Sequence, residues 1–411
     1  MKKRIELVAG VLVLLLAGGA SYFVDRMALG YLTGQRRIPG RDFAGGAVRA
    51  GGAAPGFAFL GPTEPSEDPP GVRVRQPFES GREIGLARGD VITSVDGKTF
   101  RDGQKLFQYF VREKNARDVV ELSVRAPDGA TRRVSLVLTP FLRTPKDVGL
   151  PYRDVEFRSG SGFLLRGWFI PPPEASDGRA LVFVHGAKSS RLQALEQGAA
   201  ENAHRRGYGI LVMDLSGRGA SEGKYVTYTV NEREDVKAMI RFVAQEKGVD
   251  PSRVVVFGTS NGASSVIFAA AESGTARALA LDAPFSDLWA EAGEMLESRG
   301  AGSWLRYPLA WAVRLRAGVD LAAVKPIDAI TRVQAPVLLI HGDKDREVRP
   351  YHTERLLEAR LKAGLPTERW VISGGEHGFD NYPPAREFWD RVLDFTDRAL
   401  AAAERSHPTS E

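Results

Sequence analysis

The 411-residue sequence has no cysteine. This absence excludes disulfide bonds, thiolate metal sites, a cysteine nucleophile and a lipid-modified cysteine anchor. Histidine is scarce, with 6 residues, and no cluster of His, Asp and Glu has the spacing of a metal site. The glycine-rich stretches lack the G-x-x-x-x-G-K-[ST] pattern of a phosphate-binding loop. The sequence therefore predicts neither a metal nor a bound cofactor.

Long blocks of like charge are also lacking. Lys and Arg total 56 and Asp and Glu total 51, so the chain is close to balance despite its net charge of +5. No basic block appears outside Lys2–Arg4, and we expect no nucleic-acid partner. The 43% hydrophobic and 26% charged content is typical of a globular protein, and the length suits two or three domains.

The amino-terminal segment predicts export. Lys2–Arg4 precedes the apolar run Leu7–Leu16, and Ala17–Ser21 supplies the small residues of a cleavage site. The longer stretch Leu7–Val24 is about the minimum length for a membrane-spanning helix. Residues 1–25 are therefore predicted to be a signal peptide or an uncleaved membrane anchor, and membrane contact is expected through them. The remainder would face the periplasm or the cell exterior.

Two regions follow before residue 150. Residues 26–50 are rich in Gly, Ala and Arg without a sustained period, which predicts a linker. Residues 51–140 predict a small, mostly β domain, because short β-type runs alternate with turn residues. Asp96-Gly97 supplies the chemistry of a tight hairpin turn, and Gln104–Glu113 is the one helical pattern.

Within residues 51–140, Gly85–Gly97 resembles the G-L-x-x-G-D-x-I pattern of PDZ domains, particularly those of bacterial envelope proteins. The resemblance covers about ninety residues. It implies a loop that binds the C-terminal carboxylate of a peptide through the backbone of Gly56, Phe57, Ala58, Phe59 and Leu60. Pro62 and Pro65 depart from the pattern, because each removes a backbone donor where the peptide should pair. Peptide capture and a PDZ-like spacer or docking face both stay open.

From about residue 150 to 405, short apolar runs alternate with amphipathic stretches. Such runs are typical of strands buried on both faces of a parallel sheet with helices on both sides. We therefore expect one doubly wound, mostly parallel α/β domain. The runs are Ala180–Val184, Gly209–Met213, Val254–Phe257, Ala278–Leu281 and Val337–Ile340.

One of these runs leads into Gly258-Thr-Ser260-Asn-Gly262, and an Ala/Ser-rich helical stretch follows. The pattern predicts a sharp strand-to-helix turn in which a Cβ at either glycine would collide with its surroundings. Ser260 would then be exposed above a helix N-terminus, which favours developing negative charge. We interpret Ser260 as a nucleophile rather than a helix N-cap, because glycines lie on both sides of it.

Polar loops follow the other apolar runs, and the order of their polar residues along the chain is informative. Together with Ser260, they resemble the α/β-hydrolase superfamily, in which serine, acid and histidine occur in that order. The layout is most similar to bacterial serine esterase/peptidase-like hydrolases with H-G … D-x-R-G-x-G-x-S-x-G … H-G-x-x-D-x-x-V … H. The resemblance covers about 250 residues and implies the α/β-hydrolase fold. The loops are His185–Ser190, Asp214–Gly223, His341–Val348 and Gly374–Gly378.

The resemblance implies a role for each matching residue. Ser260 would be the nucleophile, His377 the general base and then the acid, and Asp345 the carboxylate that orients the imidazole. Asp343, two residues away, is the alternative acid. An oxyanion hole would be formed by the backbone N–H groups of Ala187 and Asn261.

Other polar residues are interpreted as structural. Ser216 and Arg218 depart from the family pattern in a glycine-rich turn that is usually structural, so the triad is little affected. His185 and His341 each follow a buried run and precede glycine, which indicates turn residues. The remaining histidines are expected to be solvated: His204, His352 and His407.

Residues 286–326 are expected to form a lid over the active site. This segment contains an unusual concentration of aromatic residues, Trp289, Trp304, Tyr307 and Trp311. They fit either an apolar acyl pocket or the packing of helical lid faces, and both interpretations stay open.

Three functions are compatible with these residues. The first is a serine hydrolase that cleaves carboxylic esters, or thioesters, through an acyl-enzyme. The second is a serine peptidase similar to prolyl oligopeptidases, because Asn261 follows the nucleophile, with a PDZ-like domain that presents peptide C-termini. Residues 51–150 are too few for a β-propeller gate, whose blades need ~40–45 residues each. The third is a non-catalytic peptide-binding envelope protein, against which the intact triad argues.

Overall fold

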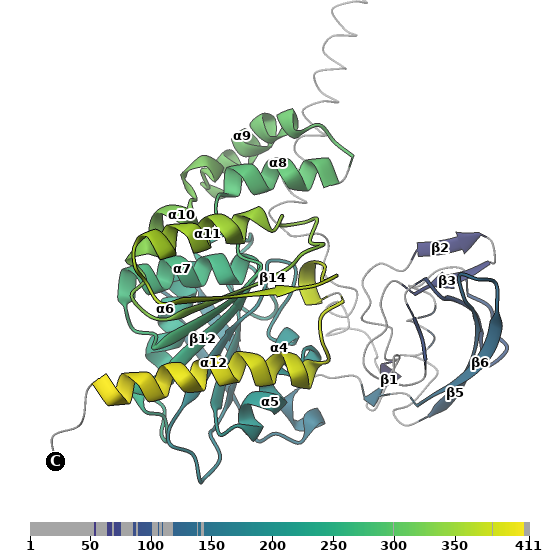
Figure 1. Ribbon diagram of the computed structural model, residues 1–411, viewed down its shortest axis with the longest axis horizontal. Helices are drawn as coiled ribbons and strands as arrows, with labels where there is room; N and C mark the ends of the chain where they lie inside the picture. Colours follow the sequence, from purple (N-terminus) through teal and green to yellow (C-terminus); the bar gives the residue numbers. More distant parts are fainter. Residues whose placement is uncertain are drawn as a thin grey trace, which may run out of the picture. The chain divides into compact units, whose positions relative to one another are not determined.

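A computed structural model of the chain (Figure 1) describes two compact units. Residues 152–382 and 389 onward belong to the larger unit, and the described residues before 152, with 383–388, belong to the smaller one. The predicted signal or anchor, the linker and the predicted loop Gly56–Leu60 lie outside the described residues. Those described are 53–54, 64–67, 70–74, 85–87, 89–100, 106, 109, 118–137, 139–140, 144–298, 300–379 and 381–406. Within these ranges, no helix has the length and apolar character needed to span a membrane.

The smaller unit contains an antiparallel five-stranded sheet in the order β2-β3-β4-β5-β6 and a short β1–β7 pair. Asp96 and Gly97 both have positive φ, and they join residues 95 and 98 as the predicted tight turn. Alternate residues of β5 are buried in the core of this unit. The described residues of the smaller unit are thus mainly β-strands, and the small domain and its PDZ-like assignment stay predictions. The elements are β1 (Ala53–Ala54), β2 (Glu64–Glu67), β3 (Pro70–Arg73), β4 (Val91–Val95), β5 (Val119–Arg125), β6 (Thr131–Val137), β7 (Thr139–Pro140) and η2 (Pro145–Val148).

The larger unit is built on an eight-stranded sheet in the order β15-β14-β13-β12-β10-β11-β9-β8. Strands β10 to β15 run parallel, whereas β8 and β9 form an antiparallel hairpin at one edge. The five predicted apolar runs form β10 to β14, and every residue of these strands is buried. The strands are β8 (Arg153–Arg158), β9 (Leu164–Ile170), β10 (Ala180–Val184), β11 (Gly209–Asp214), β12 (Val254–Thr259), β13 (Ala278–Asp282), β14 (Val337–Gly342) and β15 (Thr367–Ile372).

Helices cover both faces of this sheet, as a doubly wound domain requires. Figure 1 shows α7, α10 (Pro326–Ala329) and α11 on one face and α5 and α12 on the other. Apolar residues of α6, α7 and α11 join the sheet in one large core. The helices are α4 (Gln193–Glu196), α5 (Ala199–Arg205), α6 (Glu232–Val243), η3 (Pro251–Arg253), α7 (Asn261–Ser273), η6 (Ile330–Arg332), α11 (Tyr351–Lys362), η7 (His377–Phe379) and α12 (Ala385–Ser406).

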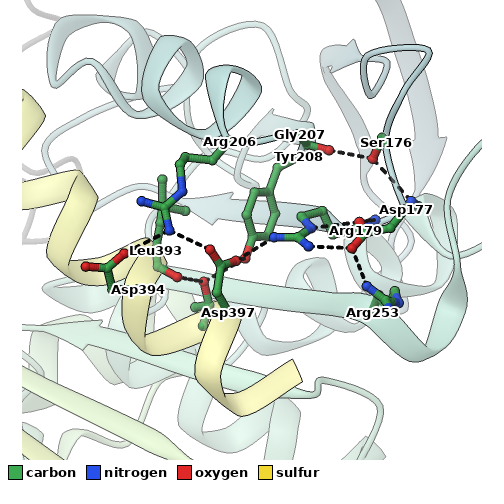
Figure 2. Close-up of polar contacts among 12 residues, drawn as sticks. Ser176, Asp177, Arg179, Arg206, Gly207, Tyr208, Arg253, Leu393, Asp394 and Asp397 are labelled. Atoms are coloured by element: carbon green, nitrogen blue, oxygen red, sulfur yellow. Dashed lines mark hydrogen bonds and ion pairs between the residues drawn. The ribbon is translucent and has the colours of Figure 1, made fainter. Parts of the chain in front are cut away.

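A network of ion pairs and hydrogen bonds fastens α12 to the amino ends of the central strands (Figure 2). The Asp397 carboxylate accepts hydrogen bonds from Arg179 at 2.7 Å, Arg206 at 2.6 Å and the Tyr208 hydroxyl at 2.6 Å. Tyr208 is fully buried, and burial together with the Asp397 carboxylate raises its pKa. Arg179 also pairs with Asp177. These charges therefore stabilise the end of the sheet that lies opposite the strand carboxyl termini.

A helical insertion, residues 288–329, separates β13 from β14. Its inner faces form a second apolar cluster with residues such as Leu288, Leu309 and Val313. Trp304 and Trp311 instead lie largely exposed, so they contribute neither to this packing nor to a buried pocket lining. The insertion consists of α8 (Leu288–Ser298), η4 (Ser303–Leu305), α9 (Arg306–Ala317), η5 (Leu321–Ala323) and α10 (Pro326–Ala329).

Candidate active site

The turn between β12 and α7 holds Ser260 in a strained backbone conformation, with φ of 53° and ψ of −125°. A Cβ built on Gly258 would lie 2.8 Å from the Cα of Ala263, and one built on Gly262 would lie 2.5 Å from the carbonyl oxygen of His185. Neither contact is sterically tolerable, so both positions require glycine. The turn predicted from the G-x-S-x-G pattern is therefore present, with the serine at its apex.

Ser260, His377 and Asp345 lie within hydrogen-bonding distance of one another. The Ser260 hydroxyl donates to His377 Nε2 at 3.0 Å, and His377 Nδ1–H donates to Asp345 Oδ2 at 2.7 Å. The three residues follow β12, β15 and β14, respectively, at the carboxyl edge of the sheet. The arrangement is a linear relay that leads from a buried carboxylate to a hydroxyl.

The structure distinguishes the two candidate acids. Asp345 is 4% exposed, and its Oδ1 accepts the backbone N–H groups of Glu347 at 2.9 Å and Val348 at 3.0 Å. Asp343 is exposed, and its carboxylate accepts the backbone N–H of Gly374 at 2.8 Å. The carboxylate that contacts the imidazole is that of Asp345.

Electrostatics favour a charged histidine at this position. Burial by itself would lower the pKa of His377, because it disfavours the cation. The Asp345 carboxylate outweighs this effect and holds the pKa of His377 above its ordinary value. Burial would likewise raise the pKa of Asp345, but His377 and His341 hold it well below its usual range. The surroundings of His377 therefore stabilise its imidazolium form.

His341 contacts the carboxylate of the relay, which the sequence did not indicate. Its Nε2–H donates to the carbonyl oxygen of Val348 at 2.9 Å, and its Nδ1 accepts from the Thr353 hydroxyl at 2.6 Å. The same Nε2 lies 3.3 Å from Asp345 Oδ2. His341 is thus a buried turn residue, as expected, and it also contacts the same Asp345 oxygen that accepts from His377.

The sequence reasoning missed a second carboxylate, that of Asp282, at the end of β13. Asp282 is fully buried, and burial raises its pKa. It accepts hydrogen bonds from the Tyr382 hydroxyl at 2.8 Å and the Thr259 hydroxyl at 3.0 Å, and its backbone oxygen accepts from Ser260 N at 2.7 Å. Because Tyr382 follows His377 closely in the chain, this carboxylate ties the histidine loop to the serine turn. The only sequence signal was an aspartate that ends a buried apolar run.

The two residues predicted for the oxyanion hole lie in segments next to Ser260. Asn261 is the first residue of α7, where a backbone N–H has no acceptor within the helix. Ala187 follows Gly186, on which a Cβ would lie 3.5 Å from the Cβ of Ser260. The loop is held by His185, whose Nδ1–H donates to the Gly186 carbonyl at 2.8 Å and whose Nε2 accepts Leu215 N at 3.0 Å. His185 is therefore structural, as interpreted.

One histidine was placed wrongly from the sequence. His352 was expected to be solvated, but it is fully buried at the start of α11, where its ring contacts Ser286 and Glu294. Its Nδ1 lies 2.8 Å from the Ser286 hydroxyl, and its Nε2 lies 3.3 Å from a carboxylate oxygen of Glu294 on α8. His204 is half-buried, and His407 lies outside the described residues.

The turn after β11 is structural, as the resemblance implied. Asp214 accepts the backbone N–H groups of Arg191 and Ala220, each at 2.9 Å. Ser216 N–H donates to the buried carboxylate of Asp235 at 2.8 Å. Across the part of the chain that the structure describes, no group of three or more His, Cys, Asp and Glu could hold a metal ion.

Comparison with known proteins places this site in a family. A model of the prolyl oligopeptidase family matches residues 198–403, which is half of the chain. An uncharacterized protein of Mycobacterium tuberculosis is 29% identical over 243 residues, which are 59% of this chain and 78% of that protein.

Solved structures are similar in fold. An esterase of Pyrococcus furiosus is 22% identical with a TM-score of 0.51, and the alignment covers 64% of this chain and 95% of the esterase. A puromycin-hydrolyzing peptidase of Mycobacterium tuberculosis is 20% identical with a TM-score of 0.52, over 69% of this chain and 46% of the peptidase. The larger unit therefore has the α/β-hydrolase fold that the sequence predicted.

Proposed function

Because the chain belongs to the prolyl oligopeptidase family, we propose that it is a serine hydrolase whose catalytic triad is Ser260, His377 and Asp345. The observation that carries this proposal is the relay of two hydrogen bonds, 3.0 Å and 2.7 Å long, at the carboxyl edge of the sheet. Ligands of open α/β sheets bind at this edge.

The proposed reaction has two steps. In the first, Ser260 Oγ attacks the acyl carbon while its proton moves to His377 Nε2, and the backbone N–H groups of Ala187 and Asn261 bind the oxyanion. His377 then gives that proton to the leaving alkoxide or amine, and an ester links the acyl group to Ser260. In the second step, His377 takes a proton from water, the hydroxide attacks the acyl-enzyme, and Ser260 is released with its proton restored.

We propose carboxylic esters, including thioesters, as the substrates. The described residues before 152 form short antiparallel sheets, and residues 51–150 are too few for a multi-bladed gate, whose blades need ~40–45 residues each. Amide cleavage is the second candidate, which the family match itself favours.

Paired substrates distinguish these candidates. We expect the purified chain to hydrolyse nitrophenyl esters with a clear preference for one acyl length, and chromogenic peptides far more slowly. Ser260→Ala should abolish turnover, and Ser273→Ala, on the same helix but remote from the relay, should not. Peptide turnover at rates comparable to the esters would favour the peptidase. If the wild type turns over neither substrate, the non-catalytic peptide-binding hypothesis replaces both.

We propose that the helical insertion is a lid. Its inner apolar cluster is joined by Ala187, one of the two proposed oxyanion residues, which supports a position beside the site. Substitutions on its inner face, such as Leu309→Ala, should change the preferred acyl length more than they change turnover of the shortest ester. An unchanged acyl-length profile in a folded Leu309→Ala variant would contradict this role.

We propose that the smaller unit is PDZ-like and binds peptide C-termini. Its antiparallel sheet supports this, whereas Pro65, within β2, weakens the pairing edge. Titration of the chain with peptides that differ only in a free or an amidated C-terminus tests the proposal, because only the free carboxylate should bind. Equal or absent binding would leave a spacer.

We also propose that the protein is exported or anchored in the inner membrane and faces the periplasm or cell exterior. The composition of residues 1–25 supports this. Protease added to intact spheroplasts should degrade the chain, and complete protection would contradict the proposal.

A further inference from the structure

Helix α9 and the turn before it carry a row of large apolar side chains on the outer surface of the insertion. Trp304, Tyr307, Trp311 and Leu315 are 60% to 67% exposed. They are half of the large hydrophobic residues found exposed in the described part of the chain. Their spacing of three and four residues places them on one face of the helix. We call this row the α9 stripe.

The α9 stripe is distinct from the face of α9 that packs inside the insertion. Leu309 and Val313, on the other face of α9, are fully buried in the insertion's apolar cluster. The helix is therefore apolar on two faces, one of which is covered and one open to solvent. A contiguous exposed apolar patch marks an interaction site, whereas single exposed apolar residues need no explanation.

The chemistry of the stripe matches a lipid headgroup region. Trp and Tyr combine an apolar ring with a polar group, and they concentrate where membranes meet water. Two of the four side chains are Trp, one is Tyr, and the fourth is Leu, the kind of residue that interfacial helices bury among acyl chains.

The segment that carries the stripe is cationic, and Asp320, directly after it in the chain, lies 3.5 Å from Arg314. Residues 299–319 include four arginines and neither aspartate nor glutamate. Arg314 and Arg316 lie in the last turn of α9, and the Arg314 side chain is largely exposed. Arg306 lies over the ring of Tyr307, 5.7 Å from its centroid. The face is therefore both apolar and cationic, which complements an anionic phospholipid surface.

We propose that the α9 stripe docks on an anionic membrane, with α9 lying in the plane of the headgroups. Its apolar side chains would reach ~5–10 Å into the boundary between headgroups and acyl chains, and the arginines would contact lipid phosphates. Ala187 packs against the insertion's apolar cluster, whereas none of the four side chains of the stripe does. This docking does not depend on Ser260, so it stands or falls separately from the proposed hydrolase activity.

The absence of cysteine makes a site-specific test direct. Single nitroxide labels are attached to Trp311→Cys and Leu315→Cys in the full chain, with Leu361→Cys as the control. Leu361 is also exposed, at 57%, but it lies on α11. Any contribution of residues 1–25 to membrane binding is common to all three variants.

In vesicles of phosphatidylcholine and phosphatidylglycerol, labels at 311 and 315 should become accessible to oxygen and shielded from a water-soluble nickel reagent. The label at 361 should stay in water. Vesicles of phosphatidylcholine alone should give much weaker insertion. Arg314→Glu combined with Arg316→Glu should raise the lipid concentration for half-maximal insertion about tenfold or more, whereas Lys362→Glu should leave it unchanged.

Three results would overturn the proposal. A label at 311 that stays as aqueous as the label at 361 would exclude docking through the stripe. A label at 311 that is already shielded without vesicles would mean that protein, from a second copy or from this chain, covers the stripe. Equal insertion into both kinds of vesicle would exclude the recognition of anionic lipid. An unchanged melting temperature shows that each variant is folded.

Discussion

The two ends of the central sheet each gather charged and polar side chains, but the two groups are built differently. At the amino end, one carboxylate, Asp397, accepts hydrogen bonds from two arginines and a buried tyrosine (Figure 2). At the carboxyl end, Asp345 contacts the imidazoles of His377 and His341, and the His377 imidazole in turn accepts the hydroxyl of Ser260.

This difference indicates that the Asp397 group serves the stability of the domain and that the Asp345–His377–Ser260 group serves its chemistry. The donors around Asp397 satisfy both of its carboxylate oxygens, and one of these donors is the hydroxyl of the buried Tyr208. The relay at the carboxyl end is linear, and it ends at a half-buried hydroxyl on a strained turn. We infer that the amino end holds the domain together, whereas the carboxyl end is arranged to move a proton.

The largest effect on activity is expected from His377→Ala. Removing the base should lower kcat/KM for a nitrophenyl ester by a factor on the order of 10⁵, because Ser260 then has no proton acceptor. Steady-state kinetics measure the loss, and circular dichroism verifies the fold. A folded variant that retains a tenth of the wild-type rate would contradict the role of His377.

The next effect separates the two candidate acids. Asp345→Asn should lower kcat by a factor of about 10⁴, since the amide cannot stabilise the imidazolium. Asp343→Asn is the matched control, because Asp343 lies two residues away, and it should change kcat less than about threefold. Equal losses in the two variants would show that the contact at 2.7 Å is not the catalytic one.

The pH dependence follows from the raised pKa of His377. Its imidazole must be neutral to accept the Ser260 proton, so kcat/KM should rise with pH through a midpoint above about 6.5. In Asp345→Asn, burial persists without the opposing carboxylate, so the midpoint should fall. Because Asp345 stabilises the histidine cation, the stability lost in this variant should be largest below about pH 6.5 and should vanish as pH rises through the native pKa of His377. An unmoved midpoint would contradict this coupling.

Tyr382→Phe should have a moderate effect. Without the hydroxyl, Asp282 loses one of its donors, and the histidine loop loses its tie to the serine turn. We expect kcat to fall about tenfold with KM nearly unchanged, because the residue positions the relay and does not bind substrate. The exposed Tyr307→Phe serves as control. A rise in KM with unchanged kcat would instead place Tyr382 in substrate binding.

The smallest effect on activity is expected at the amino end. Asp397→Asn removes the one carboxylate that Tyr208 and the two arginines share, so the free energy of unfolding should fall by about 2 kcal/mol and the melting temperature by about 4–8 °C. Below the transition, kcat/KM should match the wild type. Asp394→Asn, which removes a more exposed partner of Arg206, should cost less than about 1 kcal/mol. If folded Asp397→Asn loses activity, the amino end of the sheet does not serve stability alone, and our distinction between the two ends is wrong.

The sequence predicted the central strands well, because strands buried on both faces leave uninterrupted apolar runs such as Val254–Phe257. The positions of Ser260, Asp345 and His377 could be anticipated for a related reason. Parallel strands bring the loops after them to one edge, so a loop residue's place in the sequence almost fixes its place in space.

Contacts that depend on tertiary packing could not be anticipated in this way. Asp282 and Tyr382 are one hundred residues apart, and no local pattern joins them. His352 lies in a polar helical context, yet it is buried against Ser286 and Glu294, which are more than fifty residues away in the chain. The aromatic residues of the insertion were expected to be covered, and Trp304 and Trp311 are exposed.

The central claim is that Ser260 is a nucleophile activated at the carboxyl end of the sheet. The most direct test is reaction of the native chain with a fluorophosphonate probe, followed by mass spectrometry of the modified peptide. We predict one adduct, on Ser260, that is absent in Ser260→Ala and after thermal unfolding. No labelling of the folded wild type, or labelling of another serine, would contradict the claim.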